Sequence, residues 1–316
     1  MDPIDLTKIR TVPLASRPNK VAVEAFARPP SPGMTFREFL AGMPEIMAGD
    51  DFRNVVAAVV RARRSNRPVI AGLGGHVIKC GLSPVLIDLI RRGVITTIAS
   101  NGSVAIHDFE LALIGRTSED VTAGLRDGTF GMVRETGELM NRAVNMVLER
   151  PNAGFGQLLA EMLDEVAAPF RDVCLLTAGL RAGAPLLVHV AIGADILHMH
   201  PGANGAALGQ ASFNDFRVFC RAVSECSGGV YLNLGSAVIL PEVFLKALTV
   251  AQNLGPRLTD FTTINIDMNA HYRPVENVVR RPAAVGGRGF NLIGRHEILI
   301  PLLAQAIVEE LASVTR

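Results

Sequence analysis

Six short apolar runs alternate with helical patterns along most of this 316-residue chain, and that alternation limits the possible folds most strongly. Strands separated by helices favour a mostly parallel sheet with helices on both faces. The sequence therefore predicts an α/β, Rossmann-like fold with a mostly parallel six-stranded sheet. We expect its strands at Pro68–Leu73, Val94–Ala99, Asp172–Thr177, Ala194–Met199, Gly229–Leu234 and Phe261–Asp267.

Helical patterns connect these runs. A polar turn at Ser100–Ser103 is expected to lead into a helix, and further patterns begin at Ser83, Thr117, Ser212 and Pro241. Longer ranges are expected to be helical over Phe36–Met47, from Asp50 or Asp51, over Glu135–Val166 with a break near Pro151–Gly156, over Ala184–Ile192 and over His296–Val314. The Gly-rich stretch with Arg280, Arg281 and Arg288 is predicted to be a polar loop.

The domain organisation follows from composition. Residues 1–49 are Pro-rich and irregular, so we expect an N-terminal arm, and residues 50–316 show no linker that would divide a single α/β domain. Hydrophobic residues make up 49% of the chain and charged residues 19%, which indicates extensive burial in the sheet or in subunit contacts. We therefore expect a homo-oligomer, either a dimer or a tetramer.

Charge and targeting signals narrow the partners and the compartment. The net charge of +1 gives no field that would attract nucleic acid or an anionic membrane. The N-terminus has no secretory signal pattern, no run is long and apolar enough to span a bilayer, and the four cysteines show no C-x-x-C spacing. The expected partner is a small-molecule substrate, without nucleic acid or membrane, in a reducing cytoplasm.

Glycine and small polar residues end almost every predicted strand. Glycine permits a ligand to approach the backbone, and amide groups at the following helix can hold phosphate, although strand-to-helix turns often need glycine anyway. The sequence predicts a nucleotide-type ligand but contains neither G-x-G-x-x-G nor a P-loop, so an ordinary Rossmann dehydrogenase and a P-loop NTPase are disfavoured. The cofactor-binding candidates are Gly72, Gly74, Gly75, Ser100, Asn101, Gly102, Thr177, Ala178, Gly179, Gly202 and Asn204.

Three titratable residues after the second run are the main candidates for acid/base chemistry. On a helix His107 and Glu110 share a face, whereas Asp108 points elsewhere. A histidine beside a carboxylate can transfer protons near neutral pH. The alternative is a helix cap with a hydrogen-bonded histidine.

Two further polar groups follow later runs. His198 and His200 lie two residues apart and would face one side of a strand, but no third ligand follows, so no metal site is expected. His200 is retained as a catalytic candidate. Asp267, His271 and Arg273 form a dense polar group after the last run and are, with Glu110, the substrate-binding candidates. The alternative for the group after the last run is a solvated loop.

These segments, read in order, resemble deoxyhypusine synthase over most of residues 68–250. The likeness lies in S-N-G-S-V-A-I-H-D-F-E, in V-C-L-L-T-A-G-L-R-A-G-A-P-L-L-V-H-V-A-I-G-A-D-I-L-H-M and in G-V-Y-L-N-L-G-S-A-V-I-L-P. The resemblance implies a tetramer with a parallel NAD-binding sheet, in which Ser100–Gly102, Thr177–Gly179, His200–Gly202 and Asn233 line the dinucleotide pocket. Cys220 and Arg221 stand about where that family has its lysine nucleophile, so deoxyhypusine synthesis itself is not expected.

A shorter motif, N-G-S-V-A-I-H-D-F-E-L-A-L-I-G, is similar to one in the NAD-binding domain of bifunctional ornithine-cyclising enzymes, including the His-Asp-x-Glu pattern. The two resemblances together imply an NAD- or NADP-dependent transferase, oxidoreductase or lyase acting on a small amine- or carboxylate-bearing substrate. His107 would be the acid/base group, Asp108 would orient it, and His200 would lie near the nicotinamide or the substrate. The alternatives are a non-catalytic ligand-binding or scaffold protein on the same fold, and a protein that binds nucleotide-sugar or phosphosugar.

Overall fold

The computed structural model describes residues 2–184, 186–255 and 257–313, and the chain divides into two units, residues 1–50 and 51–316. The first unit contains three single turns of 3-10 helix, η1 (Leu6–Lys8), η2 (Leu14–Ser16) and η3 (Val23–Ala25), and one helix, α1 (Phe36–Gly42). Thr35 and Glu38 begin α1 with a capping box, because each side chain bonds to the backbone N–H of the other. The helix ends five residues before the predicted end.

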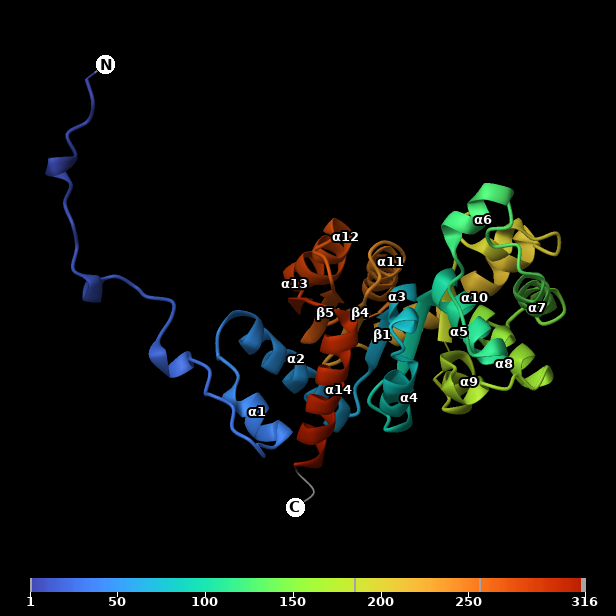
Figure 1. Ribbon diagram of the computed structural model, residues 1–316, viewed down its shortest axis with the longest axis horizontal. Helices are drawn as coiled ribbons and strands as arrows, with labels where there is room; N and C mark the ends of the chain where they lie inside the picture. Colours follow the sequence, from blue (N-terminus) through green and yellow to red (C-terminus); the bar gives the residue numbers. More distant parts are fainter. Residues whose placement is uncertain (1, 185, 256, 314–316) are drawn as a thin grey trace. The chain divides into compact units, whose positions relative to one another are not determined.

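The second unit is built on a parallel sheet, as predicted. Its strands, in the residues that the structure describes, lie in the order β3-β2-β1-β4-β5-β6, and every pair is parallel (Figure 1). The bounds are β1 (Val69–Leu73), β2 (Thr97–Asn101), β3 (Leu186–His189), β4 (Val230–Leu234), β5 (Phe261–Asp267) and β6 (Gly287–Ile293). The α/β fold class and the six-stranded sheet are confirmed.

Two of the predicted strands are wrong. Asp172–Thr177 forms the turn η5 (Arg171–Val173) and the start of helix α9 (Leu175–Arg181), and Ala194–Met199 contains the turn η6 (Ile196–Met199). The actual strands β3 and β6 lie inside the predicted helix Ala184–Ile192 and the predicted Arg- and Gly-rich loop. Asp108, from a distant part of the chain, accepts the N–H groups that start α9, which explains why an apolar run becomes helical there.

The remaining helices follow the predicted pattern, with shifted ends. No polar turn separates β2 from the next helix, which begins directly at Gly102, and the predicted end of the last helix, Val314, lies outside the described residues. The helices are α2 (Met47–Arg64), α3 (Gly75–Lys79), α4 (Ser83–Arg91), α5 (Gly102–Ile114), α6 (Val121–Asp127), α7 (Arg134–Asn145), η4 (Met146–Leu148), α8 (Phe155–Glu165), α10 (Gly205–Ser224), α11 (Ile239–Leu254), α12 (Tyr272–Pro274), the π-helix η7 (Val275–Arg280), α13 (Arg281–Ala284) and α14 (His296–Ala312). No helix among the described residues combines the length and apolarity needed to cross a membrane.

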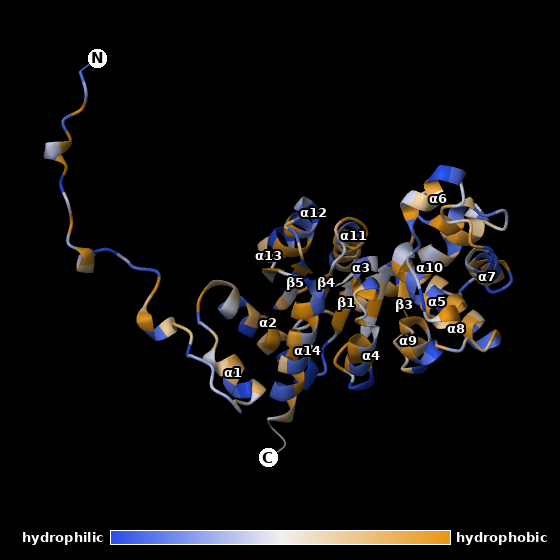
Figure 2. Cartoon of the chain, in the orientation of Figure 1, coloured by the Kyte–Doolittle hydropathy of each residue, from blue (hydrophilic) through white to orange (hydrophobic). Residues whose placement is uncertain are grey.

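Helices pack on both faces of the sheet. On one face, Phe219 of α10 and Phe244 of α11 belong to a buried cluster with Tyr231 of β4, whose ring stacks on Phe244 at 3.9 Å between centroids. On the other face, side chains of α2, α4 and α14 meet Leu232 and Leu234 of β4. Figure 2 shows that hydrophobic and hydrophilic residues both occur along the helices that surround the sheet. This two-sided burial accounts for the high hydrophobic content.

The outer edge of β3 is closed by side chains of α10. Val188 donates its N–H to Asp215 Oδ2 at 2.8 Å and accepts a bond from Ser212 Oγ at 3.0 Å, and Ser212 Oγ also accepts from the Val190 N–H at 3.1 Å. Asp215 accepts the Gly156 N–H at 3.2 Å as well, so it caps the start of α8. A single buried carboxylate therefore completes an edge strand and a helix end.

A row of three asparagines crosses the other half of the sheet. Asn233, Asn265 and Asn291 are paired in register on β4, β5 and β6. Asn233 Nδ2 donates to Asn265 Oδ1 at 2.8 Å, and Asn265 Nδ2 donates to Asn291 Oδ1 at 2.8 Å. These amides bond in one direction along the row and fix the pairing of the three strands.

The buried Asp215 gives the protein a specific pH dependence. Burial raises the pKa of its carboxyl from 3.8 to about 7, and the opposing effect of the Val188, Gly156 and Phe155 N–H donors is smaller. Between these values the folded state keeps a proton that the unfolded state has released, so the free energy of unfolding falls as the pH rises. Asp215→Asn has no such proton, and its amide cannot reproduce the acceptor geometry.

We expect Asp215→Asn to be less stable than wild type at pH 5 by about 1–3 kcal/mol. That difference should shrink by on the order of 2 kcal/mol when urea unfolding is repeated at pH 8. Asp260→Asn, at an exposed position, should keep the wild-type pH profile. A difference between wild type and the Asp215→Asn variant that stays constant with pH would contradict the prediction.

Candidate functional site

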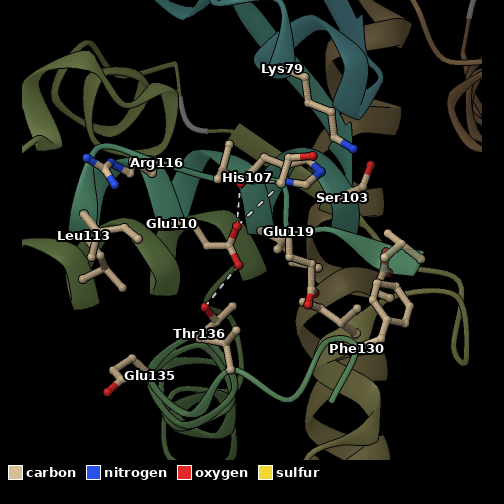
Figure 3. Close-up of a pocket in the computed structure, with 18 of the residues that line it drawn as sticks. Lys79, Ser103, His107, Glu110, Leu113, Arg116, Glu119, Phe130, Glu135 and Thr136 are labelled. Carbon is tan, nitrogen blue, oxygen red and sulfur yellow. Dashed lines mark hydrogen bonds and ion pairs between the residues drawn. The ribbon is translucent and has the colours of Figure 1, made fainter. Parts of the chain in front are cut away.

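A cavity of about 460 Å³ lies beside α5, and its walls come from α3, α5, α6, α7 and the segments that precede α6 and η6 (Figure 3). Its polar lining includes Lys79, His107, Glu110 and Asp195, and its apolar lining includes Leu113 and other aliphatic side chains. A concave, mostly apolar site with a few polar groups is typical of small-molecule binding.

Glu110 and Thr117 hold His107 at the cavity wall. The His107 Nδ1 lies 2.7 Å from Thr117 Oγ1, and that hydroxyl donates to Glu110 Oε2 at 2.5 Å. Figure 3 shows Glu110 facing His107. The direct distance from His107 Nδ1 to Glu110 Oε2 is 3.9 Å, so the Thr117 hydroxyl bridges the two. Thr136 Oγ1 donates to the other Glu110 oxygen at 3.2 Å. The sequence-predicted pair on one helix face is therefore brought together.

These bonds define the proton positions. Because the single Thr117 hydroxyl proton points to Glu110, the Thr117 oxygen accepts from His107, which places a proton on His107 Nδ1. The Nε2 atom is then the ring nitrogen available to accept a proton. Burial raises the pKa of the Glu110 carboxyl, but the contacts with His107, Thr117 and Thr136 together lower it by more. The net pKa therefore lies below its usual value. Glu110 is thus an ionised acceptor at neutral pH.

Asp108 lies on a different side of α5. Its fully buried carboxylate accepts the Leu175 and Leu176 N–H groups at 3.0 and 2.8 Å and the Cys174 thiol at 2.8 Å. Burial raises the pKa of Asp108, an effect that these bonds oppose. Through these contacts Asp108 stabilises the start of α9. The expected role of Asp108 in orienting His107 is taken instead by Thr117 and Glu110.

The strand order places a topological switch point between β1 and β4, where open α/β sheets bind ligands outside the carboxyl ends of the strands. Glycine allows close backbone contacts at this point. A Cβ at Gly74 would lie 1.9 Å from the Gly235 carbonyl oxygen. A Cβ at Gly75 would lie 2.4 Å from Ser103 Oγ and 3.5 Å from the His107 ring, so the start of α3 lies close to the histidine of the cavity.

Other predicted cofactor residues near this edge are engaged within the protein. A Cβ at Gly72 would meet the Tyr231 hydroxyl at 2.4 Å. Ser100 Oγ donates to the Leu187 carbonyl at 3.2 Å, and Asn101 caps α5 by accepting the Val104 N–H at 3.2 Å. At Gly102 a Cβ would lie 2.1 Å from Asp195 Oδ2. At Gly72 and Gly102 a side chain would therefore collide with a specific neighbour, which explains why glycine occupies both positions.

Several candidates do not lie at the switch point between β1 and β4. Thr177, Ala178 and Gly179 are in α9, which precedes β3. Gly202 and Asn204 precede α10, where Asn204 accepts the Ala206 and Ala207 N–H groups as a cap. His200 Nε2 bonds to the Gly131 carbonyl oxygen at 2.8 Å, and its ring packs on Gly137 at the start of α7. The structure does not bring this group to the switch point.

The later polar candidates divide between strand ends and surface. Asn233 and Asp267 are buried on β4 and β5, and Asn233 Nδ2 also donates to the Ser236 carbonyl at 2.9 Å. His271 and Arg273 follow β5, and Arg273 Nε lies 3.4 Å from Glu242 Oε1. None of these four residues lines the cavity beside α5.

Apart from His107 and Glu110, the residues that line the cavity are not among the predicted site residues; they include Lys79, Thr117 and Asp195. The sequence pattern predicts only a helix start at Thr117, and it places Asp195 in a strand that does not form. Lys79 reaches the cavity because α3 packs beside α5. The one sequence signal for this contact is the pair of small residues Gly75 and Ser103, which allow the helices to approach.

The described residues contain no group of three or more His, Cys, Asp or Glu side chains placed to hold a metal ion. The switch point does have features that suit a dinucleotide. Small residues (Gly74, Gly75, Gly235 and Ser236) end both flanking strands. His296, at the start of α14, packs on Gly235 and has a buried Nδ1 with no partner among the described residues.

No protein-family model and no curated protein matches this sequence. Among solved structures, a conserved LOR/SDH protein from Methanococcus maripaludis aligns with 84% of this chain and 71% of that chain, at 16% identity and a TM-score of 0.51. AgrE, solved in a ternary complex with ornithine and NAD+, aligns with 83% of this chain and 33% of that chain, at 16% identity and a TM-score of 0.53.

The chain thus spans about a third of AgrE and about 71% of the Methanococcus protein. A structure from Entamoeba histolytica with a deoxyhypusine synthase assignment aligns at 10% identity and a TM-score of 0.49, a similarity too low to support any conclusion. The resemblance stated from the sequence is confirmed for the fold: this chain has the α/β fold of the LOR/SDH-like and AgrE structures.

Proposed function

We propose that this chain is an NAD- or NADP-dependent enzyme that acts on a small amine- or carboxylate-bearing substrate. The observation that carries the proposal is the His107–Thr117–Glu110 group, which lines a cavity of about 460 Å³ and lies close to the start of α3 at the switch point. The cofactor would lie at the switch point and the substrate in the cavity.

The cofactor part of the proposal is supported by the topology and by one neighbour. Ligands of open α/β sheets bind at such switch points, and the residues that follow both flanking strands there are small (Gly74, Gly75, Gly235 and Ser236). AgrE, which shares the fold, was solved with NAD+. When bound, a nicotinamide cofactor supplies a hydride acceptor or donor.

The chain itself supplies proton transfer. With Nδ1 fixed by Thr117, His107 presents Nε2 to accept a proton from a substrate amine or hydroxyl. Ionised Glu110, linked through the Thr117 hydroxyl, stabilises the positive charge that forms on the ring. The aliphatic walls, which include Ile106, Leu113 and Val133, limit water around the reacting group.

Cofactor binding is tested first. The purified chain should show a rise in melting temperature with millimolar NAD+ or NADP+, since a ligand that binds only the folded state stabilises it. His107→Ala should retain this shift, because His107 lies on the cavity side. Absence of a shift with both cofactors, together with a shift caused by nucleotide-sugars, would replace the proposal with the phosphosugar-binding alternative.

Catalysis is tested by NADH or NADPH formation against a panel of small amines, amino acids and hydroxy acids. We expect His107→Ala to lower turnover of any active compound by roughly 10²–10⁴-fold, the usual effect of removing a general acid/base. Glu110→Gln should lower it by about ten-fold. Glu138→Gln, an exposed change on α7, is the matched control. A panel without turnover, in a protein that binds the cofactor, would favour the non-catalytic alternative.

We also propose that the chain works as a homo-oligomer, in which the N-terminal arm predicted at residues 1–49 contacts another copy. The large apolar side chains from Ile4 to Phe26 are between 53% and 85% exposed, an unfavourable arrangement for a free chain in water. Burying each such side chain at an interface stabilises assembly by about 1.5–3 kcal/mol.

The combined change of Ile4, Leu6 and Ile9 to serine should therefore raise the concentration at which the assembly dissociates by at least about ten-fold. Light scattering over a dilution series measures this directly. The double change of Lys8 and Arg10 to serine alters the same arm without removing apolar area and should leave assembly intact. A monomeric wild-type protein at all concentrations would contradict the proposal.

A further inference from the structure

Asp195 lies in the cavity wall, opposite Gly102, the first residue of α5, which has no side chain. Its carboxylate occupies the space that a side chain at Gly102 would take, since a Cβ there would lie 2.1–2.5 Å from the three carboxyl atoms. The carboxylate is therefore held against the start of a helix, next to the cavity that also contains His107 and Glu110.

The other cavity carboxylates are already engaged. Glu110 bonds to Thr117 and Thr136, Glu119 Oε1 accepts the Gly131 N–H at 2.9 Å, and Glu135 pairs with Arg134 at 2.8 Å. Asp195 has no hydrogen-bond or ion-pair partner for its carboxylate among the residues that the structure describes.

Keeping the Asp195 carboxylate charged in this position costs free energy, because the group is partly removed from water. Burial raises the pKa of its carboxyl from 3.8 to about 6, and Lys79 and Arg116, which line the same cavity, form no ion pair with it. The carboxylate is nevertheless ionised above neutral pH. A charged group that is partly removed from water without a partner gains free energy when a ligand supplies the opposite charge.

The surrounding walls define the rest of the ligand. Ile106, Leu113, Ile114, Val133 and Ile196 line the same cavity, and the apolar area suits an alkyl chain. A low-dielectric surrounding also strengthens an ion pair between the carboxylate and a bound cation. The two features together match a short aliphatic amine, which joins an alkyl chain to an ammonium group.

We propose that Asp195 is a specificity-determining residue that pairs with the ammonium group of an aliphatic-amine substrate. This assignment rests on the proposed function, because it names which of the two substrate charges the cavity selects. It predicts that amines bind in preference to alcohols of the same length, and that the preference depends on Asp195.

The test uses the full chain at pH 8 and three probes of equal length: n-butylammonium, 1-butanol and butyrate. Their dissociation constants are measured by saturation-transfer NMR. We expect n-butylammonium to bind at least about ten-fold more tightly than 1-butanol, consistent with one charge-assisted contact. Asp195→Asn should remove this preference, while 1-butanol binding stays within about two-fold of wild type because the apolar walls are unchanged.

Glu138→Gln removes one negative charge from an exposed position on α7 and should keep the preference for the amine. Melting temperatures of both variants, with and without NAD+, separate the two proposals. Equal binding of n-butylammonium and 1-butanol to wild type, or a preference that survives in Asp195→Asn, overturns the assignment even if NAD+ binds. A preference that is lost only in Asp195→Asn supports it even if NAD+ does not bind.

Discussion

The buried carboxylate of Asp108 sets the rotation of α5, and the arrangement of the cavity depends on that rotation. By accepting two N–H groups and a thiol at the start of α9, Asp108 fixes one side of α5 against a neighbouring helix. Successive residues on a helix are about 100° apart, so His107 and Glu110 must then face another direction. That direction is the cavity, where Thr117 and Thr136 complete the polar group.

Asp215 performs a similar structural role in the neighbouring layer. It satisfies the edge of β3 and the start of α8, two sets of backbone groups that no local sequence could satisfy. Such long-range contacts also explain which elements sequence patterns predict. The alternation of apolar runs and helices was sufficient for the parallel sheet, and β1, β4 and β5 lie where their runs predicted. The Asp172–Thr177 run does not form the predicted strand, because the first N–H groups of α9 bond to Asp108, which lies more than 60 positions away.

The candidate site was predictable in the same limited way. Helical spacing alone placed His107 and Glu110 on one face, since that relation is local. Lys79 and Asp195 enter the cavity through the packing of α3 and of the segment before η6 on α5, which no spacing encodes. The sequence pattern predicts that the glycines admit a ligand, whereas Gly72 and Gly102 accommodate Tyr231 and Asp195 of the same chain. Both close packing within the chain and close approach of a ligand require glycine, so the sequence alone does not distinguish the two.

The row of asparagines on β4, β5 and β6 has a consequence for how this sequence can diverge. Replacing one member leaves a buried amide unpaired and destabilises the sheet by about 1–3 kcal/mol, whereas replacing all three by apolar residues of similar size removes the need for pairing. Among descendants of this chain, positions 233, 265 and 291 should therefore change together or not at all. Selection on these three strands acts on the row as one inherited unit.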